Sequence, residues 1–239
     1  MDFIPPAPPP RDEAELFSRA RALAGLRLAR IAQQRRIEVP AEARRAKGWT
    51  GLLLEQALGA TAASRAQPDF PELGIEMKSI PVDPSGKPRE STYVCTAPLD
   101  GSLPRAWSES WVSQKLRRVL WVPIVSGPGV ALGERVVGAP LLWTPDPDED
   151  TLLRADYEEL TELIDMGEFG QMDAGRGRAM QLRPKAAHGE DLVWALDGEG
   201  QWVRTSPRGF YLRASFTRRL LARRLILPGA GLPAEGPPE

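Results

Sequence analysis

Histidine and cysteine are almost absent from this 239-residue sequence, which contains one of each, His188 and Cys95. A single cysteine excludes an internal disulfide and fits a protein that folds in a reducing cytoplasm. A single histidine argues against a zinc site built on several histidines and against a Ser-His-Asp triad. Any metal chemistry in this chain is therefore expected to depend on carboxylate ligands.

Long apolar runs are also missing, and none approaches the roughly 20 residues that span a bilayer. Residues 1–11 are rich in proline and have neither the basic stretch nor the apolar core of a secretory signal peptide. We therefore expect a cytoplasmic protein that makes no contact with a membrane. The expected organisation is a flexible tail over residues 1–11, one domain over residues 12–228 and a disordered tail over residues 229–239.

Charge is nearly balanced, with a net value of −1, but it is unevenly distributed along the chain. Residues 146–168 contain ten acidic residues and one arginine, whereas residues 203–228 contain seven arginines and no carboxylate. A chain that separates its charges in this way can present a basic face to a polyanion despite its neutral total. Because the acidic segment would repel a polyanion, we place it away from the functional cleft.

Hydrophobic periodicity predicts a mixed α/β protein in which helices and strands alternate. Helices are expected over residues 12–24, 52–58, 108–116, 151–166 and 215–226, and strands around residues 76–78 and over residues 92–97 and 119–125. The turn sequence Asp83-Pro84-Ser85-Gly86 predicts that the first two strands form a hairpin. We expect two subdomains that flank a cleft.

The stretch from Asp69 to Lys78 gathers the residues best suited to chemistry. Successive side chains of a strand point to opposite faces, so Glu76 and Lys78 share one face while Ile75 and Met77 share the other. Asp69 and Glu76 can hold a hard divalent cation through oxygen, and Lys78 can orient or deprotonate a water. These are the parts needed for metal-assisted hydrolysis of a phosphodiester. The same short pattern also occurs in ordinary strands with a surface Glu-Lys pair.

Glu55 lies on an otherwise apolar helical stripe, with Leu52 and Leu58 at a spacing of three residues. A buried carboxylate is costly without a partner. Glu55 is therefore either at the exposed margin of the stripe or a third acid that points toward Asp69 and Glu76. The pattern of this helix alone leaves both interpretations open.

Several cations are placed where an anionic ligand can bind. Lys47 precedes the N-terminus of the helix over residues 52–58, and helix N-termini attract phosphates. Lys115 lies at the end of the helix over residues 108–116, where it either faces an anion or complements the helix dipole.

The segment Gln181–Lys185 is predicted to be an exposed loop. Its two cations, Arg183 and Lys185, flank Pro184, and Arg and Lys side chains can read guanine edges in a DNA groove. They are equally compatible with ordinary surface charge. Tyr93 on its strand is compatible with simple packing or with a nucleic-acid contact.

Six segments of the sequence carry a family resemblance: Lys47-Gly48-Trp49, Asp69 with Glu76-x-Lys78, Lys78–Asp83, Lys115–Trp121, Arg183–Ala186 and Pro207–Leu212. In this order they resemble the MutH family of bacterial DNA mismatch-repair endonucleases, relatives of type II restriction enzymes. The resemblance runs over nearly the whole chain. Both tails fall outside the motifs, and the Gly/Arg-rich segment 170–179 is interpreted as a lengthened or altered loop.

This resemblance implies a restriction-endonuclease-like α/β fold, with a mixed sheet flanked by helices and two subdomains around a DNA-binding cleft. It implies an enzyme that nicks the unmethylated strand at hemimethylated GATC sites by metal-dependent hydrolysis. The implied cofactor is Mg²⁺, with Mn²⁺ as a substitute and Ca²⁺ supporting binding without cleavage. The implied partners are double-stranded DNA and the mismatch-repair ATPase MutL, with MutS acting indirectly, and the protein is expected to be a monomer.

Residues that match the family's motifs are implied to share its roles. The implied catalytic set is Glu55, Asp69, Glu76, Lys78 and Lys115. The implied metal ligands are Asp69, Glu76 and the peptide carbonyl of Met77. The implied DNA-contacting set is Lys47, Gly48, Tyr93, Arg183, Pro184, Lys185 and Tyr211. Within that last set, Arg183 to Lys185 match the base-reading segment and Tyr211 matches the methylation-sensing tyrosine.

Two alternative functions use the same residues. A stand-alone GATC restriction endonuclease would cut both strands without MutL. A catalytically silent reader of DNA methylation would bind without cutting. The set of Asp69, Glu76 and Lys78 argues against the silent reader, because clustered carboxylates repel phosphates unless a cation is present.

Overall fold

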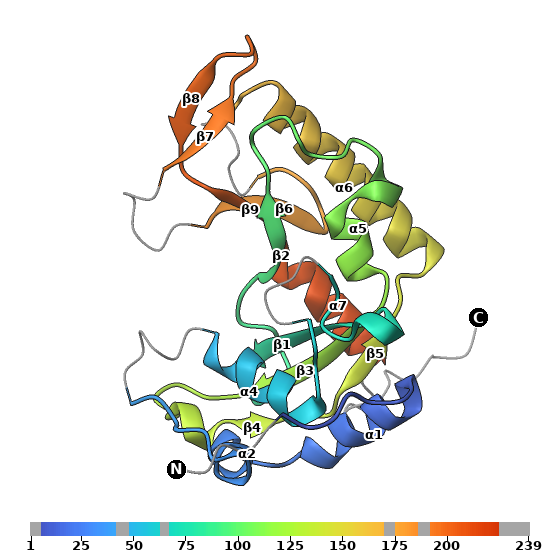
Figure 1. The fold of residues 1–239 in the computed structure, drawn as a ribbon, viewed down its shortest axis with the longest axis vertical. Helices are drawn as coiled ribbons and strands as arrows, with labels where there is room; N and C mark the ends of the chain where they lie inside the picture. The colour runs from blue at the N-terminus through green and yellow to red at the C-terminus, as the bar shows by residue number, and fades with distance from the viewer. Residues whose placement is uncertain (1–5, 42–47, 63–66, 170–174, 186–191, 225–239) are drawn as a thin grey trace, which may run out of the picture.

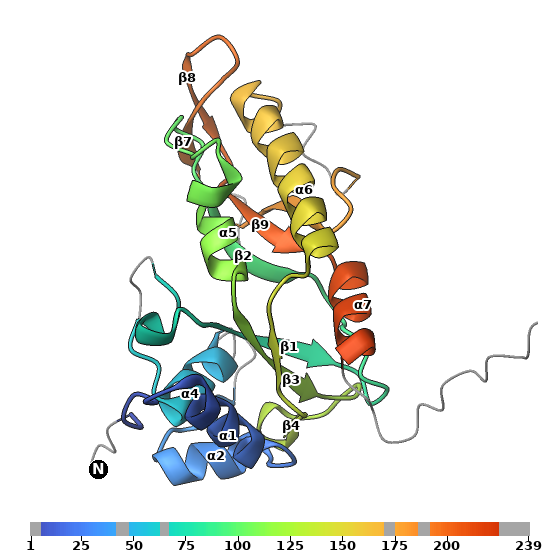
Figure 2. The same cartoon turned by 90° about the vertical axis from the view of Figure 1, so that its right-hand side faces the viewer.

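The computed structural model describes residues 6–41, 48–62, 67–169, 175–185 and 192–224. These residues form two lobes, one above the other in Figure 1 and seen from the side in Figure 2. The chain crosses between the lobes more than once, so neither lobe is a continuous stretch of sequence. None of the helices in these ranges combines the length and the apolar character needed to cross a bilayer.

The lower lobe is built from a mixed sheet with helices packed on one side of it. Its helices are α1 (Glu13–Leu23), α2 (Leu28–Arg35) and α4 (Trp49–Leu58), and its strands are β1 (Glu76–Val82), β3 (Val119–Val125), β4 (Val136–Val137) and β5 (Leu141–Trp143). β1 and β3 are parallel, whereas β4 and β5 pair antiparallel with β3. Parallel strands need a crossover connection, and the connection from β1 to β3 passes through the upper lobe.

Strand β3 lies between the two hydrophobic cores and contributes side chains to both. Its apolar run is buried on both faces, as is typical of a strand in a parallel pair. Leu120 and Val122 pack with α1, α2 and α4, whereas Val119 and Trp121 pack into the core of the upper lobe. The alternation of side chains along one strand therefore joins the two lobes.

The upper lobe contains an antiparallel sheet with strand order β2-β9-β6 and a separate hairpin. Its strands are β2 (Thr92–Ala97), β6 (Met180–Pro184), β9 (Arg208–Leu212) and the hairpin pair β7 (Val193–Leu196) and β8 (Trp202–Thr205). Its helices are α5 (Trp111–Leu116), α6 (Pro147–Asp165) and α7 (Ala214–Arg224).

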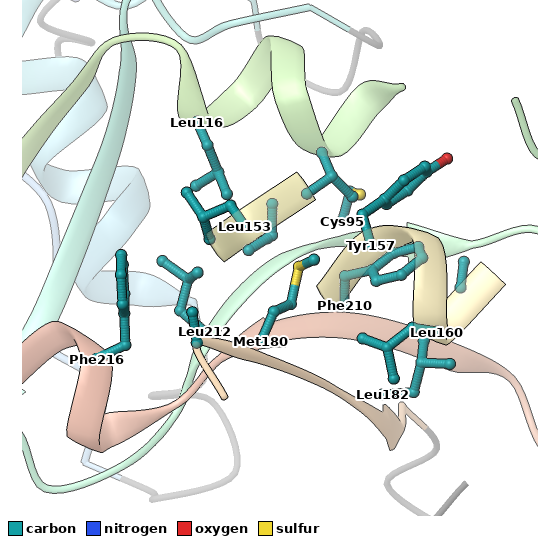
Figure 3. Packing of buried hydrophobic residues seen from close by; sticks show 14 of the residues in the cluster. Cys95, Leu116, Leu153, Tyr157, Leu160, Met180, Leu182, Phe210, Leu212 and Phe216 are labelled. Atoms are coloured by element: carbon teal, nitrogen blue, oxygen red, sulfur yellow. The ribbon is translucent and has the colours of Figure 1, made fainter. Parts of the chain in front are cut away.

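One face of the β2-β9-β6 sheet is buried beneath helices. Phe210 and Leu182 project from this face toward Tyr157 and Leu160 of α6, and Leu116 of α5 lies in the same cluster (Figure 3). The rings of Tyr157 and Phe210 are 5.5 Å apart. The side chains that alternate with these along each strand lie on the opposite face of the sheet.

The acidic helix α6 begins at Pro147, earlier than the predicted Thr151. Asp146 caps the helix, since its side chain accepts from the N–H of Glu149 while the side chain of Glu149 accepts from the N–H of Asp146. Proline is favoured at this first helical position because its missing N–H has no partner to lose. α6 covers the core face of the sheet, which confirms that the acidic segment lies away from the cleft described below.

The predicted hairpin between the first two strands is wrong. The turn forms, with the N–H of Gly86 donating to the carbonyl of Asp83 at 2.9 Å. However, β1 pairs with β3 and β2 pairs with β9, and a single bridge between Val82 and Pro88 is all that follows the turn. β3 offers β1 a neighbour that is buried on both faces, whereas β2, with Thr96 exposed, needs a sheet that is open on one side.

The segment Gln181–Lys185, predicted to be a loop, instead forms most of β6. Gln181 and Leu182 are buried, whereas Arg183 and Pro184 are exposed. β6 is an edge strand in this sheet, and a proline is tolerated there because an edge strand has N–H groups that need no partner strand.

The helix predicted over residues 108–116 is divided into two pieces. A 3-10 turn spans Trp107–Glu109, and α5 follows it. The division occurs at Ser110, which is fully buried and whose hydroxyl accepts from the N–H of Ser113 at 3.0 Å. Serine caps a helix more readily than it continues one, which explains the break.

Residues 6–10 belong to the segment that we expect to be a loosely held tail. In the structure the N–H of Ala7 donates to the carbonyl of Gln56 at 2.9 Å, and Pro10 is buried. The side chain of Arg19 donates to the carbonyls of Pro8 and Leu58, at 2.6 and 3.2 Å. This part of the N-terminal segment therefore packs against the end of α4.

Asp156 provides a test of how β6 is held in place. This buried carboxylate of α6 accepts hydrogen bonds from the backbone N–H groups of Arg178, Ala179 and Met180. Asp156→Ala would leave these donors without an acceptor, so we expect the free energy of unfolding to fall by about 2–4 kcal/mol. Urea denaturation measures this loss.

The matched control is Glu158→Ala, two residues along the same helix. Glu158 is exposed and pairs with Arg154 across one helical turn, so its removal should change the free energy of unfolding by less than about 0.5 kcal/mol. Equal losses for the two variants would contradict the role assigned to Asp156.

Candidate active site

Asp69 and Glu76 are brought together by a short bridged loop. Phe70 and Ile75 exchange two backbone hydrogen bonds, of 2.9 and 3.2 Å, and the chain between them turns through a 3-10 segment. Gly74 ends that segment with a φ of 64°, a conformation that glycine adopts without strain. The residues that flank the bridge, Asp69 and Glu76, are therefore neighbours. The six-residue spacing between them is the length of this loop.

Glu76 is 2% exposed, and two ammonium groups hold its carboxylate. Lys78 Nζ donates to Glu76 Oε1 at 2.7 Å, as the alternation along β1 predicts. Lys115 Nζ, from the last turn of α5, lies 3.0 Å from Oε1 and 2.9 Å from Oε2. A buried carboxylate is unfavourable unless it is paired in this way. The pair with Lys115 also joins a helix of the upper lobe to a strand of the lower lobe.

Asp69 faces the backbone of the same strand. Its Oδ2 atom accepts from the N–H of Met77 at 2.8 Å. Burial, followed by the negative charge of Glu76, raises the pKa of Asp69, although the Met77 hydrogen bond and the two lysines act in the opposite direction. Burial is thus the main reason that the charged form of Asp69 is disfavoured, and the nearby charge of Glu76 adds to it.

Glu55 belongs to the same site and not to an exposed helix margin. It is half-buried on α4, and it lines the cleft described below. Burial, followed by the charges of Asp69 and Glu76, raises the pKa of Glu55. This electrostatic coupling favours the interpretation of Glu55 as a third acid.

The donor chemistry of this site fits a hard divalent cation. Its carboxylates are oxygen donors, and the charged form of Asp69, which burial and the charge of Glu76 disfavour, would be stabilised by a nearby cation. Mg²⁺ commonly takes only one or two carboxylates and keeps several waters. Among the described residues, no group of three or more His, Cys, Asp and Glu side chains is arranged to hold a metal ion. Because lysine ammonium groups contact both oxygens of the Glu76 carboxylate, a metal ion could bind there only if at least one lysine moved away.

A cleft of about 630 Å³ lies between the two lobes. From the lower lobe it is lined by Gly48, Glu55, Met77 and Lys78, and from the upper lobe by Tyr93, Arg183, Pro184, Lys185 and Tyr211, together with other residues. Of the predicted catalytic residues, Glu55 and Lys78 line this cleft, whereas Asp69, Glu76 and Lys115 are not among its lining residues. The predicted DNA-contacting residues that the structure describes all line it. Gly48 precedes α4 with a φ of 80°. Lys47, predicted to contact DNA, lies outside the described residues.

The upper wall of the cleft is the open face of the β2-β9-β6 sheet. Tyr93 and Tyr211 lie directly opposite each other on β2 and β9, with ring centroids 5.3 Å apart in an edge-to-face contact. The guanidinium of Arg183 lies 5.6 Å from the Tyr211 ring, and the ammonium of Lys185 lies 5.1 Å from the Tyr93 ring. Burial, followed by the nearby hydroxyl of Tyr93, raises the pKa of the Tyr211 hydroxyl.

A β-bulge in β2 shapes both walls. The register shifts between Tyr93 and Cys95, so that Val94 is the extra residue. The bulge turns Cys95 into the core, where burial raises its pKa to about 11, and turns Thr96 onto the cleft face with Tyr93. The carbonyl of Val94 lies 3.5 Å from Lys78 Nζ, at the limit of a hydrogen bond.

Several residues of the cleft region were not identified from the sequence, among them Glu90, Ser91, Thr96 and Gly209. Glu90 and Ser91 line the cleft, and Thr96 bonds to Tyr93 and Lys185. Gly209 lies close to both rings, since an added Cβ would make tight contacts of 3.0 Å with Tyr93 Cε2 and 3.2 Å with Tyr211 Cε2. The glycine within the segment Pro207–Leu212 was a possible signal, because glycine inside a strand often marks a close approach.

The raised pKa of Asp69 predicts a gain in stability when its charge is removed. A carboxyl whose pKa is raised by folding stabilises the protein fully below its unfolded pKa of about 3.9, and this contribution is lost as the pH rises through the folded pKa. Asp69→Asn, without added metal, should therefore raise Tm at pH 7 by about 2–4 °C, on the order of 1 kcal/mol. The gain should vanish near pH 4.

Asp83→Asn is the control with the opposite sign. Ser85 and Lys87 lower the pKa of Asp83 through hydrogen bonds, so this variant should lower Tm at pH 7. Thermal unfolding from pH 4 to pH 8 measures both. A lower Tm for Asp69→Asn than for the wild-type protein at pH 7 would show that the negative charge of Asp69 does not destabilise the folded protein.

Comparison with known proteins agrees with this geometry. The family model described as "MutH: DNA mismatch repair enzyme MutH" matches residues 58–156. The chain is 48% identical over 228 residues to the DNA mismatch repair protein MutH of Serratia proteamaculans, covering 95% of this chain and 100% of that protein. It is 50% identical over 216 residues to the protein of the same name from Vibrio cholerae serotype O1, covering 90% and 98%. The chain therefore belongs to the MutH family of DNA mismatch repair enzymes.

Proposed function

We propose that this chain is the endonuclease that nicks the unmethylated strand at hemimethylated GATC sites during DNA mismatch repair. One observation carries the proposal: the buried pairing of Glu76 with Lys78 and Lys115 adjoins the same cleft whose opposite wall presents Arg183 and Lys185. The lower wall has the chemistry to hydrolyse a phosphodiester, and the upper wall has the chemistry to read base edges. A duplex in the cleft would meet both walls at once.

Asp69, Glu76 and the carbonyl of Met77 are the residues that would hold Mg²⁺, with Mn²⁺ as a substitute. When bound, the ion would act as a Lewis acid toward the scissile phosphate and lower the pKa of a water. Ca²⁺ has the charge to support DNA binding but is expected not to support cleavage. The pairing of Met77 N–H with Asp69 fixes the carboxylate beside the strand that carries Glu76.

The lysines and Glu55 have roles that follow from their positions. Lys78 lines the cleft, so its ammonium can orient the attacking water. Lys115 adds a second positive charge, which stabilises the negative charge that develops on the phosphate. Glu55, with its raised pKa, is a better proton acceptor than an ordinary glutamate, and it is placed to assist in activating that water.

Discrimination between methylation states is proposed to depend on Tyr211. Its ring lies between Tyr93 and Arg183 on the wall that would face the major groove. The N6-methyl group of adenine adds bulk beside the exocyclic nitrogen, where a tyrosine would sit. The resulting clash or lost hydrogen bond is worth about 1–3 kcal/mol.

Family membership supports the remaining parts of the proposal. We propose that the enzyme is a cytoplasmic monomer, weakly active alone and activated by MutL after MutS has found a mismatch. A stand-alone restriction endonuclease would cut both strands without MutL, and a silent methylation reader would not cut in any metal. The carboxylate cluster beside the cleft argues against the silent reader, because it opposes DNA binding unless it serves catalysis.

Glu76→Ala tests the catalytic cluster. It removes the partner of both lysines, so we expect nicking in Mg²⁺ to fall by a factor on the order of 10³ or more. DNA binding should persist, because the two ammonium groups remain and one negative charge is lost. Strand nicking and gel-shift titration in Ca²⁺ measure the two properties.

Glu72→Ala is the matched control. Glu72 is exposed on the loop between Asp69 and Glu76, and the Glu76 carboxylate pairs with Lys78 and Lys115, so nicking should be preserved. Nicking at the normal rate by Glu76→Ala would remove this cluster from the chemistry.

Tyr211→Ser tests the methylation sensor. The ratio of nicking rates between hemimethylated and fully methylated GATC duplexes should fall by about 10-fold, with a smaller change on unmethylated DNA. Trp202→Ser, which removes an exposed aromatic ring on β8 outside the cleft, should leave the ratio unchanged. An unchanged ratio in Tyr211→Ser would exclude Tyr211 as the sensor.

A further inference from the structure

The two cations on the upper wall each have a hydroxyl partner and an aromatic partner. Arg183 Nη1 donates to Ser91 Oγ at 2.5 Å, and its guanidinium lies over Tyr211. Lys185 Nζ donates to Thr96 Oγ1 at 2.7 Å and lies over Tyr93. Thr96 belongs to β2 and Ser91 directly precedes it, whereas Arg183 belongs to β6 and Lys185 directly follows it. Each cation is therefore held by one hydroxyl group and one aromatic ring.

The register of the strands explains why these contacts of Arg183 and Lys185 form. Gly209 of β9 has Thr96 of β2 on one side and Arg183 of β6 on the other. Because Gly209 has no side chain, the rings of Tyr93 and Tyr211 can close over it from the neighbouring positions. The β2 bulge supplies the last requirement, since it places Tyr93 and Thr96 on the same face although they are three residues apart.

The Thr96 hydroxyl, which holds Lys185, also contacts a second hydroxyl group. Tyr93 Oη lies 2.9 Å from Thr96 Oγ1. An ammonium only donates, so Thr96 must accept from Lys185, which leaves its own hydrogen and a second lone pair for Tyr93. The Thr96 hydroxyl is thus held by its contact with Tyr93, and it in turn holds the ammonium group at the end of the long Lys185 side chain.

We propose that Ser91 and Thr96 are positioning residues for base recognition: Ser91 sets the guanidinium of Arg183, and Thr96 sets the ammonium of Lys185. This inference rests on the proposed function, in which these cations read base edges. Arg and Lys side chains lose much rotamer freedom when they bind, and ordering them before DNA arrives removes part of that cost. A cation that is held in one place also discriminates between bases better than a mobile one.

The experiment is a binding titration in Ca²⁺ with the full-length chain. Its probes are one GATC duplex and a set of duplexes that each carry a single base-pair change in GATC. Thr96→Val keeps the shape of the side chain and removes its hydroxyl; we expect it to lower the preference for GATC by about 3- to 10-fold, the equivalent of one hydrogen bond. Thr96→Ser should restore most of the preference.

Double variants separate positioning from a structural role. In a Lys185→Met background, Thr96→Val should have no further effect, because the group that it positions is already gone. Ser91→Ala should depend on Arg183 in the same way and should affect a different set of base pairs. Thr96 is exposed and Ser91 half-buried, so the variants are expected to unfold at the wild-type temperature.

Three results would overturn the inference. The first is an unchanged GATC preference in Thr96→Val while the wild-type protein is selective. The second is an equal loss of affinity for every duplex. The third is an effect of Thr96→Val that persists in the Lys185→Met background. A wild-type chain that binds all duplexes alike would overturn the proposed function itself, and this inference with it. Selective wild-type binding with an unaffected Thr96→Val variant would overturn the inference alone.

Discussion

The ionic contact of Glu76 with Lys78 and Lys115 is the interaction on which the rest of the structure depends. Glu76 and Lys78 come from the lower lobe and Lys115 from the upper lobe, so one buried carboxylate connects both halves of the molecule. A shift of one lobe against the other would change this contact directly. The chemistry of the site and the width of the cleft are therefore coupled through a single side chain. Strand β3, with one face in each core, provides the rigid wall behind it.

The upper wall of the cleft is organised by a different constraint, the register of β2 against β9. One extra residue in β2 brings Tyr93 and Thr96 to the same face, and Gly209 leaves room for the aromatic rings between them. The core face of the same sheet is filled by α5, α6 and α7, which fixes the sheet without using its open side. The residues proposed for recognition and those proposed for catalysis thus lie on separate walls. Under this proposal, a change on the upper wall alters base preference without removing Asp69 or Glu76.

Much of the lower wall could be predicted from the sequence because it depends on local geometry. The alternation along one strand placed Glu76 and Lys78 together, and a short loop explains their spacing from Asp69. The pairing of β1 with β3 was missed because a turn signal reports only local conformation, whereas the choice of partner strand depends on burial of both faces. The role of Thr96 was missed for a related reason. A bulge reverses which residues face the cleft, and neither composition nor periodicity reveals where it occurs.

The central claim is that the two walls act on one duplex, so that recognition on the upper wall directs strand cleavage on the lower wall. The most direct test is a strand-resolved nicking assay in Mg²⁺ on a duplex with one GATC site in its unmethylated, hemimethylated and fully methylated forms, with and without MutL from the same source. The account predicts cleavage of the unmethylated strand only, at GATC, and faster with MutL. Efficient cutting of both strands without MutL, or no cutting in any state while binding is intact, would contradict it.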